Sequence, residues 1–415
     1  MKKSVTALAL GTAVIATIAL AGCSGAAAAG GGTAAKSGTK VDKVVIGSLH
    51  PETGSSAADG QAMDNGAQMA VDAINKAGGI KSLGGAKLEL DKGDTKGTPD
   101  VASTEANREI SDGAVALIGT YASGVSTTIS ALAEKAQVPF VMDISAADSI
   151  LQQGYKYSFR VQPSATAIGT QGADAVAAIA AKNGVKLSKV GYLYDQGAGE
   201  TSLEVAFAKE AKAKGFTVDT AIKYDSMSLT DATTQIAQIK AAGDTTLIVS
   251  GYYADSLAIA KSIAASGIKL DAVFGVGDGA YDQQTFLTDA PNGGEGYYNT
   301  NYAIAKSAEG QQFATDYQAK FNTPVRTGAA LAYDAVQVIA AGLEDSGSAD
   351  PVKLRDAIAA EKSYTGIAFG SGPIAFSSTG ENTSARTVAT QILGGKVTVV
   401  YPDDQATGTA KFPAF

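Results

Sequence analysis

The sequence predicts an α/β protein made of two doubly wound lobes with parallel sheets, joined by a hinge. Apolar runs at residues 44–46, 115–118 and 246–249 are continuous rather than alternating, which is typical of strands buried on both faces. Helical patterns follow these runs, and this alternation produces right-handed βαβ units. The alternation of strands and helices is interrupted by a linker near residue 164, so we expect two separate blocks of βαβ units.

The first segment of the chain is predicted to be an export signal. A short basic start precedes an apolar run over residues 5–20, which is too short for a stable membrane span. The tetrapeptide that ends at Cys23, the only cysteine, resembles a bacterial lipobox, so residues 1–22 would be removed and Cys23 lipidated. An ordinary secretory signal with an incidental cysteine is the alternative. Residues 23–40 are low in complexity and are expected to form a flexible stalk.

Residues 41–164 are expected to form the first part of lobe 1. The predicted strands lie at residues 44–46, 88–90, 115–118 and 140–142. The first predicted helix has an apolar face made of Met63, Ala67, Ala70, Val71 and Ile74. Two further helices are predicted near residues 98–112 and 124–135, so each lies between two strands and can cover a face of the sheet.

Residues 165–300 are expected to form the main part of lobe 2. Its predicted strands lie at residues 190–194, 216–222, 246–249 and 272–274, and its predicted helices lie near residues 167–183, 200–214, 231–241 and 254–266. The remaining chain is expected to return to each lobe in turn. Residues 301–385 would complete lobe 1 with helices at residues 308–321, 327–345 and 351–361. Residues 386–415 would complete lobe 2 with strands at residues 387–393 and 397–401, followed by a tail.

Composition limits the classes of function. The net charge of −8 makes nucleic acid and anionic lipid poor partners. His50 is the only histidine, so the sequence offers no histidine cluster for a metal ion, and metalloprotease, CxxC and P-loop motifs are absent. We therefore predict a binding protein without metal, cofactor or catalytic residues. A hydrolase that works with carboxylates alone is the enzymatic alternative.

Candidate ligand-binding residues follow the strand ends, because ligands of open α/β sheets bind beyond the carboxyl ends of the strands. Tyr121 and Ser123 follow a strand of lobe 1, and Tyr252 and Asp278 follow strands of lobe 2. At a helix start, Ser123 offers a hydroxyl and N–H groups to a carboxylate, or is a plain N-cap. Asp278 lies between two glycines, where it can hold an ammonium group or satisfy its own turn. Tyr252 can cover a ligand or belong to the core.

Further motifs extend over nearly the whole folded body. They are VIGSL at residues 45–49, NGA at 65–67, AVDAIN at 70–75, AGGI at 77–80, the Ile118-Gly119 and Val138-Pro139 pairs, residues 157–160 and YDAV at 333–336. From about residue 43 to 400 the chain resembles the leucine/isoleucine/valine-binding proteins. This family comprises substrate-binding subunits of ABC importers with the type I periplasmic-binding fold, so the resemblance implies that architecture.

The resemblance also implies roles for individual residues. Ser123 falls on the serine that holds the ligand carboxylate, Tyr252 on a pocket tyrosine, and Asp278 on the acidic residue that holds the ligand amine. Ile144 falls on a position that contacts the ligand through its backbone. Ser145 is the only hydroxyl near the place of a ligand-touching threonine.

The chain departs from the family pattern at other pocket positions. The threonine position is Ala146, two pocket tyrosines fall on Asp59 and Gly199, and Asp143 adds a further charge. The pocket is therefore altered, and a leucine ligand does not follow from the resemblance. Amides, urea and polar or cationic amino acids stay open as ligands.

The combined expectation is a solute-binding lipoprotein of an ABC importer. It would capture an amino acid by hinge closure and deliver it to permease subunits. The lipidated Cys23 would hold it on the cell surface or the periplasmic side of the membrane. The alternatives are a protein of the same fold that binds an amide, urea or another small organic solute, and a sensor that reports a ligand without transport.

Overall fold

The structure, a computed structural model, describes residues 41–304, 306–368 and 372–415. The described residues belong to one compact unit that contains two sheets. The predicted signal, the predicted stalk and Cys23 lie outside the described residues. Among the described helices, none is long and apolar enough to cross a membrane.

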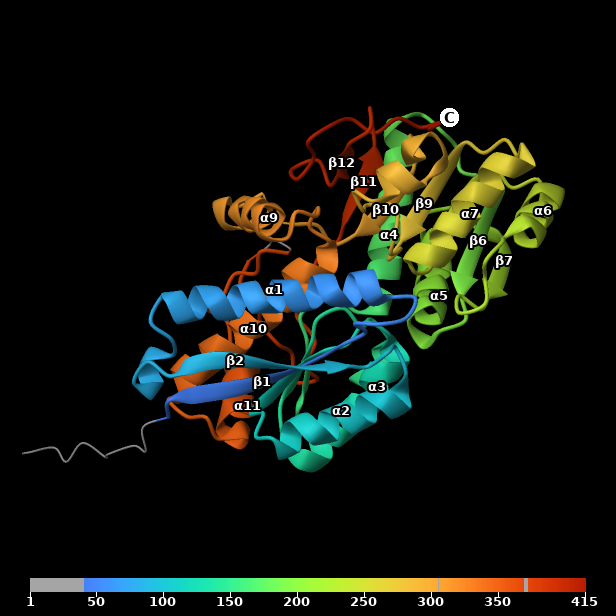
Figure 1. The fold of residues 1–415 in the computed structure, drawn as a ribbon. Helices are drawn as coiled ribbons and strands as arrows, with labels where there is room; N and C mark the ends of the chain where they lie inside the picture. The colour runs from blue at the N-terminus through green and yellow to red at the C-terminus, as the bar shows by residue number, and fades with distance from the viewer. Residues whose placement is uncertain (1–40, 305, 369–371) are drawn as a thin grey trace, which may run out of the picture. The chain divides into compact units, whose positions relative to one another are not determined.

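The first sheet has five strands, which are parallel and lie in the order β2-β1-β3-β4-β5. Their bounds are β1 Lys43–His50, β2 Lys87–Asp94, β3 Ala116–Gly119, β4 Phe140–Met142 and β5 Ser158–Arg160. Figure 1 shows its strands β1 and β2 side by side, with α1 (Ala57–Lys76) along them. β1 runs beyond the predicted residues 44–46, because polar Ser48 and His50 are buried with hydrogen-bond partners. β5 is short and contains Arg160, whose buried guanidinium donates to the carbonyl oxygens of Ala146 and Ala147.

Two layers of helices cover the first sheet. On one face, α1 (Ala57–Lys76) packs along α10 (Thr327–Ser346), and α11 (Pro351–Ala360) packs on α10. A Cβ atom on Gly66 of α1 would lie 1.9 Å from the carbonyl oxygen of Ala329, so a glycine is required where α1 meets α10. On the other face lie α2 (Pro99–Ser111) and α3 (Ser123–Ala136). We call this sheet and its helices, with α9 (Ala308–Phe321), lobe 1.

The second sheet has seven strands in the order β12-β11-β10-β9-β8-β6-β7. Their bounds are β6 Val190–Asp195, β7 Val218–Tyr224, β8 Thr246–Ser250, β9 Ala272–Val276, β10 Tyr298–Asn301, β11 Val388–Ile392 and β12 Val397–Tyr401. The strands from β6 to β10 are parallel, whereas β11 and β12 add an antiparallel edge. The sheet is therefore mixed, because a tight Gly394-Gly395 turn with positive φ joins β11 to β12 as a hairpin.

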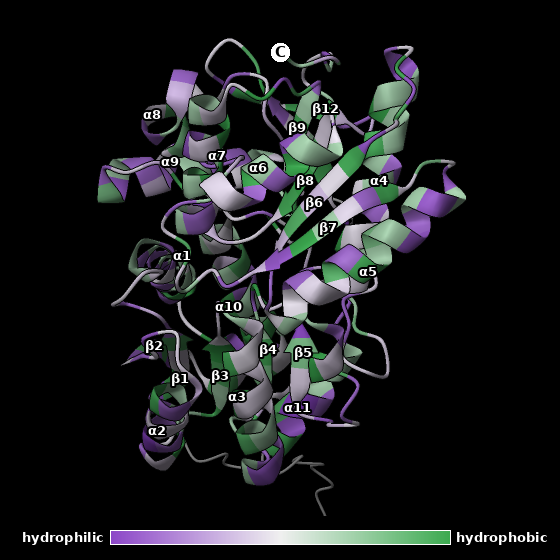
Figure 2. Cartoon of the chain, turned by 90° about the vertical axis from the view of Figure 1, so that its right-hand side faces the viewer, coloured by the Kyte–Doolittle hydropathy of each residue, from purple (hydrophilic) through white to green (hydrophobic). Residues whose placement is uncertain are grey.

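Helices also cover both faces of the second sheet. α4 (Ala165–Lys182) and α5 (Ala198–Ala213) pack together on one face, and α6 (Thr233–Ala242) and α7 (Tyr253–Ser266) pack on the other. The short helix α8 (Phe286–Asp289) and the 3₁₀ turns η1 (Lys81–Leu83), η2 (Asp148–Ile150) and η3 (Pro291–Gly294) complete the described elements. Figure 2 shows hydrophobic strands β3, β4, β6 and β8 beside helices with hydrophilic outer turns. We call this sheet and α4 to α8 lobe 2.

The described chain passes between the lobes at several places. It leaves lobe 1 after β5, returns after β10, and enters lobe 2 again before β11. Both cores are buried on two faces of their sheets, as the continuous apolar runs predicted. The α/β fold class with two doubly wound lobes is confirmed.

Candidate functional site

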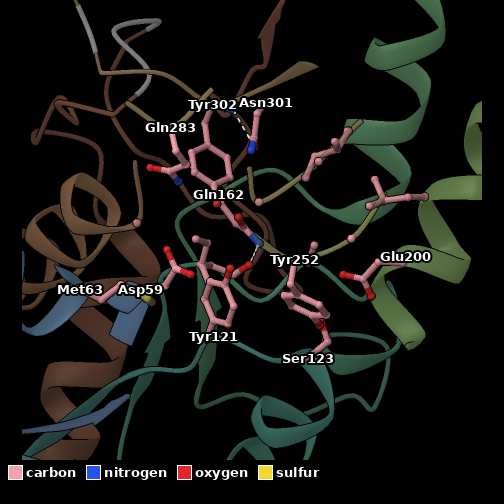
Figure 3. Close-up of a pocket in the computed structure, with 18 residues that line it drawn as sticks. Asp59, Met63, Tyr121, Ser123, Gln162, Glu200, Tyr252, Gln283, Asn301 and Tyr302 are labelled. Carbon is pink, nitrogen blue, oxygen red and sulfur yellow. Dashed lines mark hydrogen bonds between the residues drawn. The ribbon is translucent and has the colours of Figure 1, made fainter. Parts of the chain in front are cut away.

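A cavity lies where the strand ends of lobes 1 and 2 face each other (Figure 3). Residues at or beyond the carboxyl ends of β3, β4 and β5 line it from lobe 1, and residues beyond β6, β8, β9 and β10 line it from lobe 2. Its apolar side chains are those of Met63, Ile144, Ala146, Ile168 and Leu203. Its polar side chains are those of Asp59, Tyr121, Ser123, Gln162, Glu200, Tyr252, Gln283, Asn301 and Tyr302.

Two tyrosines from opposite lobes meet at the cavity. Tyr121 follows β3, and Tyr252 is the N-cap of α7 after β8. Their ring centroids are 5.4 Å apart with planes at 48°. Both rings also line an outer cleft between the lobes, which includes Thr53 and Met227. The tyrosine pair therefore stands between the inner cavity and the outer cleft.

Ser123 lies at the beginning of α3 and lines the cavity. Ala122 is the N-cap, so the Ser123 hydroxyl does not cap the helix; its Oγ accepts a hydrogen bond from the Ala147 N–H at 3.2 Å. Across the cavity, a Cβ atom on Gly199 of α5 would lie 3.1 Å from this Oγ. The absent side chain of Gly199 therefore lets the two lobes approach at Ser123.

Ile144 and Ser145 follow β4 and face different ways. Ile144 lines the cavity, whereas Ser145 is fully buried and does not line it. The Ser145 hydroxyl accepts a hydrogen bond from Ser126 at 2.6 Å and donates to the Thr120 carbonyl oxygen at 3.0 Å. Ser145 therefore fixes the loop between β3 and α3, which carries Tyr121 and Ser123.

Asp278 lies behind the lobe 2 side of the cavity, which its neighbours Gly277 and Gly279 line. Its carboxylate is fully buried: Oδ1 accepts from the N–H groups of Ala280 and Tyr281, and Oδ2 accepts from the Ser256 hydroxyl at 2.5 Å. Burial raises the pKa of Asp278 well above its ordinary value. The observed contacts are those of a carboxylate that shapes its own turn.

The sequence assigned no role to Asp59, which stands where the family has a pocket tyrosine. The structure places Asp59, on α1, in the cavity wall. Its Oδ1 accepts from the Arg326 guanidinium at 2.7 Å. Burial raises the pKa of Asp59, and the charge and hydrogen bond of Arg326 act in the opposite direction. Arg326 also lies 5.0 Å from the ring of Tyr253 in lobe 2. Sequence reasoning did not find Arg326, because no strand end precedes it.

Glu200 is a second carboxylate in the cavity wall, and sequence reasoning missed it. It lies in the first turn of α5, shortly after the carboxyl end of β6. The Tyr252 hydroxyl is in hydrogen-bond contact with it, and burial raises the pKa of Glu200 to about 7. Acidic residues are common in the first turn of a helix for reasons of stability alone, so the sequence carried no specific signal.

Three side-chain amides of the cavity were also missed. Gln162 follows β5, Asn301 ends β10, and Gln283 follows β9. Gln162 donates to the Ile144 carbonyl oxygen, and Asn301 donates to the Asp278 carbonyl oxygen at 3.1 Å. The strand-end rule would have found Gln162 and Asn301 if β5 and β10 had been recognised.

A closed network of polar residues lies beneath the lobe 1 side of the cavity. His50 Nε2 is 2.7 Å from Asp143 Oδ2, its Nδ1 is 2.9 Å from Asp64 Oδ1, and Ser48 donates to the same Asp64 oxygen at 2.6 Å. Burial alone lowers the pKa of His50, but Asp143 and Asp64 together raise it to about 10. All four residues are at most 1% exposed, so this network supports the strand ends rather than contacting a ligand. No His, Cys, Asp and Glu cluster suited to a metal ion occurs among the described residues.

The comparison with known families identifies the class of protein. The family described as periplasmic binding protein matches residues 43–396, so the chain belongs to this family. One curated relative, the Leu/Ile/Val-binding protein homolog 8 of Brucella melitensis, is 29% identical over 379 residues, which cover 89% of this chain and 93% of the relative.

Solved structures share the fold. The branched-chain amino acid transporter substrate-binding protein LivJ of Streptococcus pneumoniae, in complex with isoleucine, has a TM-score of 0.75 and 24% identity, with 87% of this chain and 100% of that chain covered. A solute-binding protein of an ABC transporter from R. palustris, in complex with benzoate, has a TM-score of 0.75 and 22% identity, with 90% and 96% covered. The fold is therefore found with ligands of different chemistry.

Proposed function

We propose that this chain is an extracytoplasmic solute-binding protein of an ABC importer, which captures a small amino-acid-like solute and delivers it to permease subunits. One observation carries the proposal: the cavity wall comes from both lobes, and Tyr121 of lobe 1 meets Tyr252 of lobe 2 at its boundary. A site divided between two lobes forms when they approach and releases its ligand when they separate.

The individual residues have distinct proposed roles. Tyr121, Ser123, Ile144 and Tyr252 would contact the ligand, because their side chains line the cavity. The N-terminus of α3 at Ser123 suits a ligand carboxylate. Ser145 and Asp278 would hold the surrounding loops from behind, since their side chains are buried in hydrogen bonds to those loops.

Binding without turnover fits the chemistry of the cavity wall. Ser123, the one serine among the described lining residues, is hydrogen-bonded to a backbone N–H, and the only histidine, His50, is enclosed between two carboxylates. A serine nucleophile needs an adjacent base to be activated. The amino-acid class is supported by the Leu/Ile/Val-binding name of the curated relative and by the isoleucine complex of LivJ.

The proposed location is the outer side of the membrane, with Cys23 as a lipid anchor. Family membership supports an extracytoplasmic location, and the lipobox-like sequence before Cys23 supports the anchor. In cells fed an alkyne fatty acid, the full chain should become labelled and fractionate with membranes, whereas a Cys23→Ser variant should not be labelled. Equal labelling of both chains would contradict the anchor.

A thermal-shift screen of residues 24–415 tests the binding function. The panel holds the common L-amino acids, small amides, urea and carboxylic acids such as benzoate. A ligand at about 100 times its dissociation constant adds roughly 2.7 kcal/mol and should raise the melting temperature by a few degrees. A hit in any class supports solute binding, and its class identifies the solute. A chain that responds to no compound in the panel would contradict the proposal.

A further inference from the structure

The charged side chains that line the cavity are all acidic. Of the described residues that line it, Asp59 and Glu200 carry acidic side chains, and none is Lys, Arg or His. Asp59 is compensated by Arg326 at 2.7 Å, within lobe 1. Glu200 lies on the opposite side, beside the ring of Tyr252 (Figure 3).

The surroundings of Glu200 add negative rather than positive charge. The charged groups that act on it most are Asp195 of β6 and Asp255 of α7, and both raise its pKa. Both are already occupied: Asp195 accepts from the N–H groups of Gly197 and Ser226, and Asp255 accepts from the Tyr224 hydroxyl. Of the three carboxylates Asp195, Glu200 and Asp255, Glu200 is the one that lines the cavity.

The remaining groups near Glu200 do not neutralise it. On its own helix, Glu204 lies one turn further along, and Lys223 of β7 acts on Glu204 and on the ring of Tyr194. The groups that face Glu200 from the other packed elements are the hydroxyls of Tyr192 and Tyr252. Burial and the neighbouring carboxylates together place the pKa of Glu200 at about 7, so a cation beside it would draw it into the charged form.

Aromatic rings complete the environment that a cation prefers. The rings of Tyr121, Tyr252 and Tyr302 all line the cavity, and the faces of such rings attract ammonium and guanidinium groups. The α3 N-terminus at Ser123 lies close by, since Gly199, the residue before Glu200, approaches the Ser123 hydroxyl. An anion site at the α3 N-terminus and a cation site at Glu200 would therefore occupy neighbouring parts of the same cavity wall.

We infer that Glu200, and not the buried Asp278, binds the ammonium group of the ligand, and that the solute class is therefore an amine-bearing amino acid rather than a simple carboxylic acid or neutral amide. This inference rests on the proposed solute-binding function of the same cavity. Asp278 is excluded from the role because its oxygens accept from Ser256, Ala280 and Tyr281, and its side chain is fully buried behind Gly277 and Gly279.

The test compares three isosteric variants by calorimetry. The probes are amino acids and their analogues without the α-amine, namely L-leucine with 4-methylpentanoate and L-lysine with 6-aminohexanoate. Wild type should bind at least one of the two L-amino acids. It should bind the analogue without the α-amine at least about 30-fold more weakly. Glu200→Gln should lose about 30-fold or more of this affinity, whereas Glu204→Gln, one turn along α5, should lose none. Asp278→Asn should lose much less affinity than Glu200→Gln in chains that thermal unfolding shows to be folded, because Asp278 supports its loop and does not contact the ligand.

A proton-linkage measurement separates charge recognition from a structural effect of Glu200. Binding to wild type at pH 7 should release protons, seen as a dependence of the observed enthalpy on the ionisation enthalpy of the buffer, and affinity should rise about tenfold from pH 6 to pH 8. Glu200→Gln should remove both effects, whereas a purely structural role of Glu200 would leave them in place.

The outcomes distinguish the inference from the proposed function. Amino-acid binding that survives in Glu200→Gln and disappears in folded Asp278→Asn overturns the inference and leaves solute binding intact. A wild-type chain that binds only carboxylic acids or amides without an amine also overturns the inference and leaves solute binding intact. A wild-type chain that binds none of the probes and nothing in the thermal-shift panel overturns both.

Discussion

His50 is a buried cation held between two carboxylates beneath the cavity. Its ring nitrogens lie 2.7 Å from Asp143 and 2.9 Å from Asp64, and its pKa is raised to about 10. The folded chain therefore keeps a proton that the unfolded chain loses above the ordinary value of 6.5. The stabilisation is fully present below pH 6.5 and is lost as pH rises toward about 10.

We predict that the free energy of unfolding, measured in urea, falls between pH 7 and pH 9.5 by up to about 1.4 kcal/mol per pH unit from this group. A His50→Gln variant should be less stable by about 3–5 kcal/mol at pH 7, because two buried carboxylates lose their cation. Its stability should fall less steeply with pH than that of wild type. Adding Asp143→Asn to the His50→Gln variant should restore part of the lost stability, because one of the two unpaired carboxylates is then neutral. Parallel pH profiles for wild type and His50→Gln would contradict this account.

The candidate site could be predicted in part from single residues. The strand-end rule led to Tyr121, Ser123 and Tyr252, and all three side chains line the cavity. It also led to Asp278, but a sequence does not tell whether an aspartate after a strand points into a cavity or back to its own turn. Glu200 was missed because an acidic residue in the first turn of a helix is explained by helix stability alone, so the sequence gave no reason to place it in a site.

At the scale of elements, α10 begins with a residue that links the lobes. Arg326 is its N-cap, bonds Asp59 in lobe 1, and stacks on the ring of Tyr253 at the beginning of α7 in lobe 2. Its Nη2 also lies 3.5 Å from the Thr285 hydroxyl of lobe 2. The beginnings of α10 and α7 are therefore joined by one guanidinium.

We predict that Arg326→Gln accelerates ligand dissociation by about 2- to 30-fold, because a partly desolvated cation–π contact contributes about 0.5–2 kcal/mol. Stopped-flow release of the bound solute measures the rate. Tyr253→Leu should have a similar effect, and combining it with Arg326→Gln should add little. Tyr253→Phe, which keeps the ring, is the matched control. Fully additive effects of Arg326→Gln and Tyr253→Leu would contradict a shared contact.

Elements with continuous apolar cores were predictable, and polar strands were not. The predicted strand at residues 246–249 is β8, and the predicted helix at residues 327–345 is α10. β10 reads Tyr-Asn-Thr-Asn and gives no hydrophobic signal, because its buried amides donate to the Asp278 carbonyl oxygen instead of packing. Such a strand is visible only when its distant partner is known.

At the scale of the whole molecule, ligand capture by lobe closure requires that lobes 1 and 2 separate and meet again. Near the cavity, α3 of lobe 1 approaches α5 of lobe 2, where a Cβ atom at position 199 would lie 3.9 Å from the Cβ atom of Ser123. This separation matches that of a disulfide, whose Cβ atoms are typically 3.5–4.5 Å apart. The native chain has no cysteine other than Cys23, so a new pair would have no competing partner within the described residues.

We predict that a chain carrying Ser123→Cys and Gly199→Cys, with Cys23→Ser, forms this disulfide on oxidation and holds the lobes together. Ligand bound before oxidation should then exchange far more slowly with labelled ligand than in the same chain after reduction. The reduced chain is the internal control, because it carries the same substitutions and lacks only the covalent link. Each single-cysteine variant should exchange ligand at the same rate under both conditions. If the disulfide forms and the exchange rate does not change, the solute enters and leaves without separation of the lobes, and capture by closure is wrong.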